Sequence, residues 1–105
     1  MKKEDLDNLD QFMNMDGADQ LEELGFEIDE YNGYTYTFSM DLTSKLKDAE
    51  ARAYIGVSFV DNCFYIEGFI ENYEVQDSTT FFRKTARNWA QFETEFEKLI
   101  DYLEY

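Results

Sequence analysis

The sequence predicts an α+β domain in which helices cover one face of an antiparallel meander sheet of four to five strands. Strand-like runs form two candidate hairpins, and amphipathic patterns predict two short N-terminal helices and one C-terminal helix. With 105 residues, of which 44% are hydrophobic, the chain is long enough for one core, so residues 1–105 are expected to form a single domain.

The two N-terminal helices are predicted from the spacing of apolar residues. Over residues 4–14 the apolar side chains share one stripe, and acidic side chains on the other side suit the positive end of the helix dipole. A second helix is expected over residues 17–24. Asp16 can cap its beginning, and Gly25 fits the position just after its end.

A first hairpin is predicted over residues 26–40. We favour a three-residue loop at residues 31–33, with Gly33 in a left-handed bulge, over a two-residue turn at residues 32–33. The longer loop pairs Ile28 with Tyr36 and Phe26 with Phe38, so that the apolar side chains share one face. The opposite face then carries Glu27, Asp29, Thr35, Thr37 and Ser39.

The strongest hairpin signal covers residues 51–72. Asp61-Asn62 suits a two-residue type I′ turn, because Asp and Asn tolerate positive φ. This turn pairs Val60 with Cys63 and continues to a pair between Ala53 and Ile70. Strand alternation then places one apolar set on a single face, consisting of Ala53, Ile55, Val57, Phe59, Phe64, Ile66 and Ile70.

Residues 79–86 fit either a fifth strand or the beginning of a long helix. Asn88 followed three residues later by Gln91 is a helix-start signature, so we expect the last helix to run from Trp89 to about Glu104. Its aromatic and aliphatic residues share one stripe, and its carboxylates lie largely off that stripe.

Nothing in the sequence indicates catalysis. Histidine is absent, so Cys63 or a serine would lack the usual general base, and a single cysteine forms no disulfide and no CxxC site. Residues 16–19 lack the alternating oxygen ligands of a calcium loop. We therefore expect no enzyme, no cofactor and no metal. Without a transmembrane stretch or a signal-peptide core, a cytoplasmic protein that binds no membrane is expected.

The net charge of −15 is unevenly distributed, because residues 1–32 hold 11 acidic and 2 basic side chains. Solubility needs a net charge of only about 2–8 in magnitude. Adaptation to a salty cytoplasm would also give an acidic chain. A third explanation is a basic partner, since surface carboxylates at high density can occupy a groove built for phosphates. The same charge disfavours direct binding to nucleic acid.

In size, charge and the acidic segments EDLDNLD, DQLEEL and FEIDEY, the chain resembles the small DNA-mimic inhibitors of phages and mobile elements. These include anti-CRISPR and anti-restriction proteins. The resemblance implies a protein that acts in the cytoplasm of the host cell. It would block the basic nucleic-acid-binding surface of a nuclease or another defence protein by phosphate mimicry.

The expected partner-binding residues are acids of the N-terminal helices and the first strand, with one aromatic beside them: Asp7, Asp10, Asp19, Glu22, Glu23, Glu27, Asp29 and Tyr31. Tyr54 and Phe69 are secondary candidates, whose other interpretation is an ordinary cross-strand pair. Two alternatives to mimicry stay open. One is an immunity- or antitoxin-like protein, and the other is an adaptor or an oligomer subunit.

Overall fold

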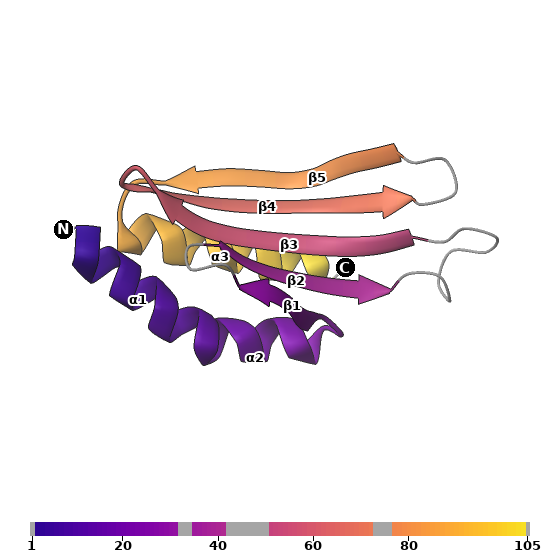
Figure 1. The fold of residues 1–105 in the computed structure, drawn as a ribbon, viewed down its shortest axis with the longest axis horizontal. Helices are drawn as coiled ribbons and strands as arrows, with labels where there is room; N and C mark the ends of the chain where they lie inside the picture. Colours follow the sequence, from indigo (N-terminus) through magenta and orange to yellow (C-terminus); the bar gives the residue numbers. More distant parts are fainter. Residues whose placement is uncertain (1, 32–34, 42–50, 73–76, 105) are drawn as a thin grey trace.

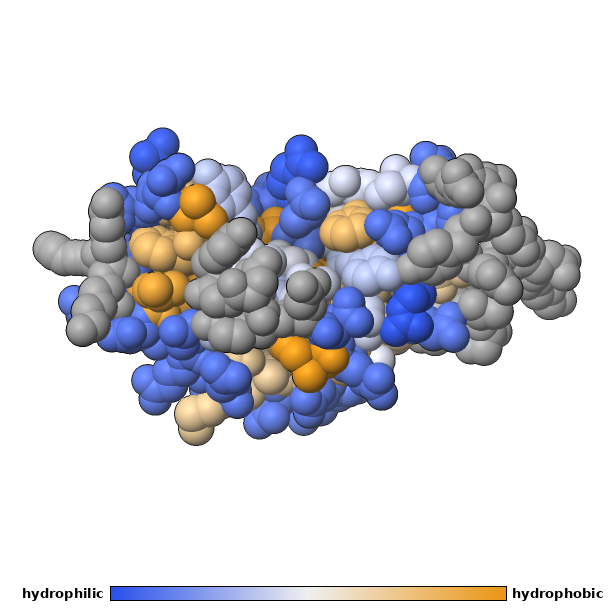
Figure 2. All heavy atoms as spheres, in the orientation of Figure 1, coloured by the Kyte–Doolittle hydropathy of each residue, from blue (hydrophilic) through white to orange (hydrophobic). Residues whose placement is uncertain are grey.

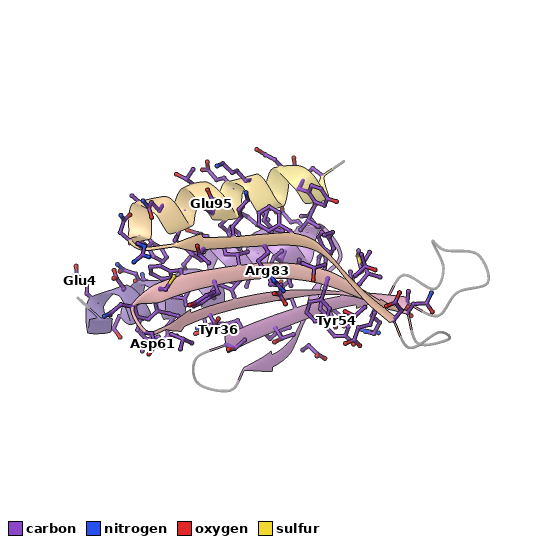
Figure 3. All side chains as sticks on the ribbon, turned by 90° about the horizontal axis from the view of Figure 1, so that it is seen from above. Glu4, Tyr36, Tyr54, Asp61, Arg83 and Glu95 are labelled. Carbon is purple, nitrogen blue, oxygen red and sulfur yellow. The ribbon has the colours of Figure 1, made fainter. Side chains whose placement is uncertain are left out.

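The computed structural model describes residues 2–31, 35–41, 51–72 and 77–104 and confirms the α+β class (Figure 1). The elements are α1 (Lys2–Asn14), α2 (Asp16–Glu23), β1 (Glu27–Tyr31), β2 (Thr35–Asp41), β3 (Ala51–Val60), β4 (Cys63–Asn72), β5 (Asp77–Ala86) and α3 (Trp89–Leu103). The five strands form one antiparallel meander in the order of the chain, β1-β2-β3-β4-β5. The helices pack on one face of this sheet, and Figure 3 shows α3 lying along that face.

The central hairpin has the predicted register from Val60–Cys63 to Ala53–Ile70. Asp61 and Asn62 adopt φ values of 53° and 63°, as a type I′ turn requires. Burial alternates along β3, with the apolar residues turned toward the helices. Local turn chemistry and strand alternation agree here, and their agreement fixes the register.

The predicted register of the first hairpin is wrong. Ile28 pairs with Phe38 and not with Tyr36, and the bulge lies between Ile28 and Glu30. Ile28 still shares the face of its cross-strand partner Phe38, but at the edge of the sheet its side chain is 54% exposed, whereas those of Tyr36 and Phe38 are buried. An edge strand has a single neighbour to set its register, and bulges are common there. The predicted bulge residue, Gly33, lies outside the described residues.

Ser39, which we expected on the polar outer face, is buried. Its Oγ accepts a hydrogen bond of 2.9 Å from Nη2 of Arg52 on the neighbouring strand. The long arginine side chain therefore covers the serine and satisfies its hydroxyl, so burial leaves no unpaired polar group at this position.

Residues 79–86 belong to a strand, which decides between the two alternatives that the sequence left open. Gly68 pairs with Phe82 and Phe69 with Thr80, so Phe81 is the extra residue of a bulge. A Cβ atom at Gly68 would lie only 2.7 Å from Cζ of Phe81. The missing side chain at Gly68 thus makes room for the Phe81 ring.

The helix boundaries follow the predictions with one correction. Asp16 is the first residue of α2 and not its cap, because Met15 occupies the cap position without a side-chain hydrogen bond. Gly25 does occupy the predicted position after the end of α2, directly after the C-cap Leu24, with φ at 101°. At α3, Oδ1 of Asn88 accepts from the Gln91 backbone N–H at 2.9 Å, which confirms the predicted cap.

An aromatic cluster joins the helices to the sheet. The ring of Phe92 on α3 lies 5.0 Å from that of Phe64 on β4 and 5.8 Å from that of Phe12 on α1. Phe12 is in turn 5.1 Å from Phe96, in an edge-to-face arrangement. Such pairs contribute about 0.5–1.5 kcal/mol beyond the burial of their area. The cluster fixes the rotation of α3 about its axis.

Removing the aromatic ring of Phe92, at the centre of this cluster, should destabilise the fold. Phe92 is fully buried, so Phe92→Ala is expected to lower the free energy of unfolding by about 3–5 kcal/mol in urea denaturation. Thr94→Ala, at an exposed position of the same helix, should change it by no more than about 0.5 kcal/mol. Equal losses in the two variants would contradict the central role of the cluster.

Candidate protein-interaction surface

Carboxylates from two helices line one groove on the helical face of the protein. Asp16 and Asp19 of α2 lie on one side, and Glu93 and Glu97 of α3 lie on the other. All four side chains are exposed. Each pair belongs to one helix face, because residues three or four apart are neighbours on a helix. The groove has a volume of about 360 Å³, and Phe12 and Phe96 contribute to its lining.

A second depression, of about 270 Å³, extends the first between α1 and α3. The two share the lining residues Phe12, Asp16 and Glu93. We call the combined feature the interhelical groove. Apart from these shared residues, the extension is lined by uncharged polar and apolar side chains, namely Asn8, Gln11, Met15 and Trp89. The negative charge is therefore concentrated at the α2 end.

No cation whose side chain the structure describes forms an ion pair with the carboxylates of the interhelical groove. Within the described residues, the ion pairs are Arg83–Glu67 at 2.8 Å and Lys98–Glu95 at 3.0 Å, and neither involves the groove. Two rows of like charge facing each other repel, so the groove is a favourable position for a cationic group from another molecule.

The acidic residues that the sequence predicts to bind a partner do not all line one depression in the structure. Six of its acids are exposed: Asp7, Asp19, Glu22, Glu23, Glu27 and Asp29. Asp19 lines the interhelical groove, whereas Glu27 lines a separate depression together with Asp41 and Arg52. Tyr31 belongs to β1, but its side chain lies outside the described structure.

Asp10 occupies a different environment from the other predicted acids. Its side chain is half-buried, and its Oδ1 accepts a hydrogen bond from the hydroxyl of Tyr36 on β2. This contact connects α1 to the sheet across 26 positions of the chain. Hydrogen bonds to charged groups contribute about 1.5–3 kcal/mol. We therefore assign Asp10 to holding α1 in place.

Sequence reasoning left Asp16, Glu93 and Glu97 out of the predicted site. Glu93 and Glu97 were visible as carboxylates off the apolar stripe of the last helix, one turn apart. Their partner across the groove, α2, ends some seventy positions earlier in the chain. The spacing of residues in the sequence predicts which side chains are neighbours on one helix, but not which helices pack together. Only the packing of α3 beside α2 brings these charges together.

Tyr54 and Phe69 stack on each other as a cross-strand pair. Their ring centroids lie 5.2 Å apart with an interplanar angle of 15°. Both side chains are half-buried on the sheet face opposite α3, and Figure 3 places Tyr54 away from that helix. Each ring covers part of the other, so the ordinary cross-strand interpretation accounts for both residues.

Cys63 and Tyr65 lie at the beginning of β4, just after the central turn. The Cys63 thiol donates to the Phe64 carbonyl at 3.6 Å, and the charge of a Cys63 thiolate raises the pKa of the neighbouring Tyr65 hydroxyl. The described part of the chain contains no cluster of three or more acidic, cysteine or histidine side chains suited to hold a metal ion. None of its helices is long and apolar enough to cross a bilayer.

Comparison with known protein families, with curated proteins and with solved structures finds no match for this chain. The interaction surface is therefore interpreted from its own chemistry.

The role assigned to Asp10 can be tested by a double-mutant cycle. Tyr36→Phe and Asp10→Ala should each lower the free energy of unfolding by about 1.5–3 kcal/mol. The double variant should lose clearly less than the sum of the two, because both changes remove one shared hydrogen bond. Tyr65→Phe, at an exposed tyrosine, is the control. Additive losses from Tyr36→Phe and Asp10→Ala would show that the two residues act independently.

Proposed function

We propose that this protein is an acidic inhibitor that binds the basic nucleic-acid-binding surface of a nuclease or another defence protein in place of its phosphates. The observation that carries the proposal is the interhelical groove, in which Asp16, Asp19, Glu93 and Glu97 face solvent without a described cation beside them. Such a surface attracts lysine and arginine side chains and repels nucleic acid.

The spacing of these carboxylates suits phosphate mimicry. A helix rises about 1.5 Å per residue, so Asp16 and Asp19 lie about 4.5 Å apart along their axis, and Glu93 and Glu97 about 6 Å. One strand of B-DNA carries a phosphate about every 3.4 Å along its axis. Each helix thus presents negative charge at a comparable density, and the two helices present it as two rows.

The rigidity of the two rows favours binding. α3 is held by the aromatic cluster, and α2 ends in backbone hydrogen bonds from Gly25 to Glu22 and from Phe26 to Leu21, both of 3.0 Å. Because the backbone of both helices is already ordered, binding a partner costs little backbone entropy, so more of the electrostatic attraction contributes to affinity.

A charge-matched pair of variants tests the proposal. The triple variant Asp19→Lys, Glu93→Lys and Glu97→Lys should abolish inhibition in a panel of restriction and CRISPR nucleases assayed on DNA. The control carries Asp77→Lys, Asp101→Lys and Glu104→Lys, three exposed acids outside the groove lining, and makes the same change in net charge. It should retain inhibition.

Two outcomes would overturn this assignment. If both variants lose inhibition equally, total charge rather than the groove is responsible. If the wild-type protein inhibits no nuclease in the panel but binds a basic toxin at the same carboxylates, it is an immunity protein. Circular dichroism of both variants establishes that the fold survives the changes.

The affinity for the partner should depend strongly on salt. We expect the dissociation constant, measured by surface plasmon resonance, to rise about tenfold or more between about 50 and 200 mM salt, because screening weakens attraction between exposed charges. Most of the change should appear in the association rate. An affinity that is constant over this range would show that the contact is predominantly apolar and would contradict mimicry.

A further inference from the structure

A second groove lies on the other flank of α3, beside strand β5. Among the strands that the structure describes, β5 pairs with β4 alone and is therefore an edge strand. Beyond the bulge at Phe81, residues 82–86 pair regularly with β4, from Gly68–Phe82 to Phe64–Ala86. Alternate residues of an antiparallel edge strand direct their N–H and C=O groups away from the sheet. This part of β5 therefore presents unpaired backbone donors and acceptors to another chain.

A cleft of about 460 Å³ runs between this edge and α3. Thr85 lines it from β5, and α3 contributes Ala90, Gln91, Thr94 and Glu95. Figure 3 shows Glu95 on the part of α3 that runs beside β5. A strand added at the edge of β5 would direct alternate side chains toward the cleft, as in other proteins that bind peptides by extending a sheet.

A hydrogen bond holds the two walls of the cleft together, and one wall contains a carboxylate oxygen that accepts no hydrogen bond from the described part of the chain. The Gln91 side chain accepts from the Arg87 backbone N–H at 2.9 Å, which ties the end of β5 to α3. Oε1 of Glu95 pairs with Lys98 at 3.0 Å, but its Oε2 is buried without a hydrogen-bond donor among the described residues. Buried polar atoms usually have a partner, and Oε2 is enclosed by the protein rather than open to the cleft.

This edge is basic in an otherwise acidic protein. Arg83, Lys84 and Arg87 are exposed and supply three of the nine lysine and arginine residues of the chain. Arg83 forms an ion pair with Glu67, which is also partly exposed. Lys84 and Arg87 form no ion pair with another described residue. Their charges are available to a carboxylate brought in along the edge.

We propose that the edge of β5 and the β5–α3 cleft form a docking site for an extended acidic segment of a partner protein, which adds a sixth strand to the sheet. A second copy of β5 is a poorer occupant. Antiparallel pairing of two copies would bring Arg83 and Lys84 of each chain near the same residues of the other, and like charges across a ladder are destabilising. The site goes beyond the proposed function and uses none of the interhelical carboxylates.

The test uses an acetylated and amidated heptapeptide of alternating glutamate and threonine, with a lysine-for-glutamate peptide as comparison. The titration is carried out at physiological ionic strength, where the screening length is about 8 Å. Under this condition the peptide responds mainly to the nearby cations of the β5 edge and little to the acidic residues elsewhere on the protein. Heteronuclear NMR titration should give saturable shifts at the amides of residues 82–86, Gln91 and Glu95. Alternate amides of residues 82–86 should exchange more slowly with deuterium. The lysine peptide should shift none of them.

Three variants locate the binding. The double variant Lys84→Glu and Arg87→Glu should raise the dissociation constant of the acidic peptide about fivefold or more, since two attractive charges become repulsive. Thr94→Trp should abolish binding by filling the cleft, whereas Asn14→Trp, at an exposed position of α1, should leave it unchanged. Shifts confined to side chains, without slowed exchange along β5, would overturn strand addition. Slowed exchange of these amides without peptide, with dimers in sedimentation, would assign the edge to a second copy.

Discussion

The packing of one aromatic stripe decides most of this structure. Phe92 and Phe96 of α3 must be buried, and the available apolar surface is the inner face of β4 together with Phe12 of α1. Burying a large apolar side chain contributes about 1.5–3 kcal/mol, so this stripe outweighs any single surface charge in orienting the helix. Once the stripe faces the sheet, every other side chain of α3 has a determined direction.

The orientation of α3 determines which residues line the interhelical groove and which line the β5–α3 cleft. The residues on one flank of α3, Glu93 and Glu97, meet α2, whereas Gln91 and Glu95 on the other flank meet β5. Charged groups cannot share the stripe, because burying an unpaired carboxylate costs far more than the helix gains. The carboxylates are therefore confined to the flanks. On the α2 side Glu93 and Glu97 form the acidic row, and beside β5 Glu95 pairs with Lys98 through Oε1 and buries Oε2.

The separation of acidic and basic surfaces on the molecule also follows from the packing of the helices on the sheet. Residues 1–32, which include both N-terminal helices and β1, carry −9 of the net charge of −15, from 11 acidic and 2 basic side chains. The apolar stripes of the two helices hold them on the sheet face that α3 also occupies. The cations of β5 lie at an edge of the sheet, where long charged side chains remain in water and oppose pairing with a strand of like charge. An acidic groove and a basic edge thus flank the same helix, and they suit partners of opposite charge.

The sequence by itself determined what local chemistry controls: the turn at Asp61-Asn62, the register of β3 with β4, and the cap of α3 at Asn88. These depend on residues near one another in the chain. Tertiary structure alone decided the register of β1, the strand at residues 79–86, and the meeting of Asp19 with Glu93 and Glu97. The first two were decided by the strands that each segment pairs with. The third required the buried stripe of α3, which fixes the distance between helices far apart in sequence.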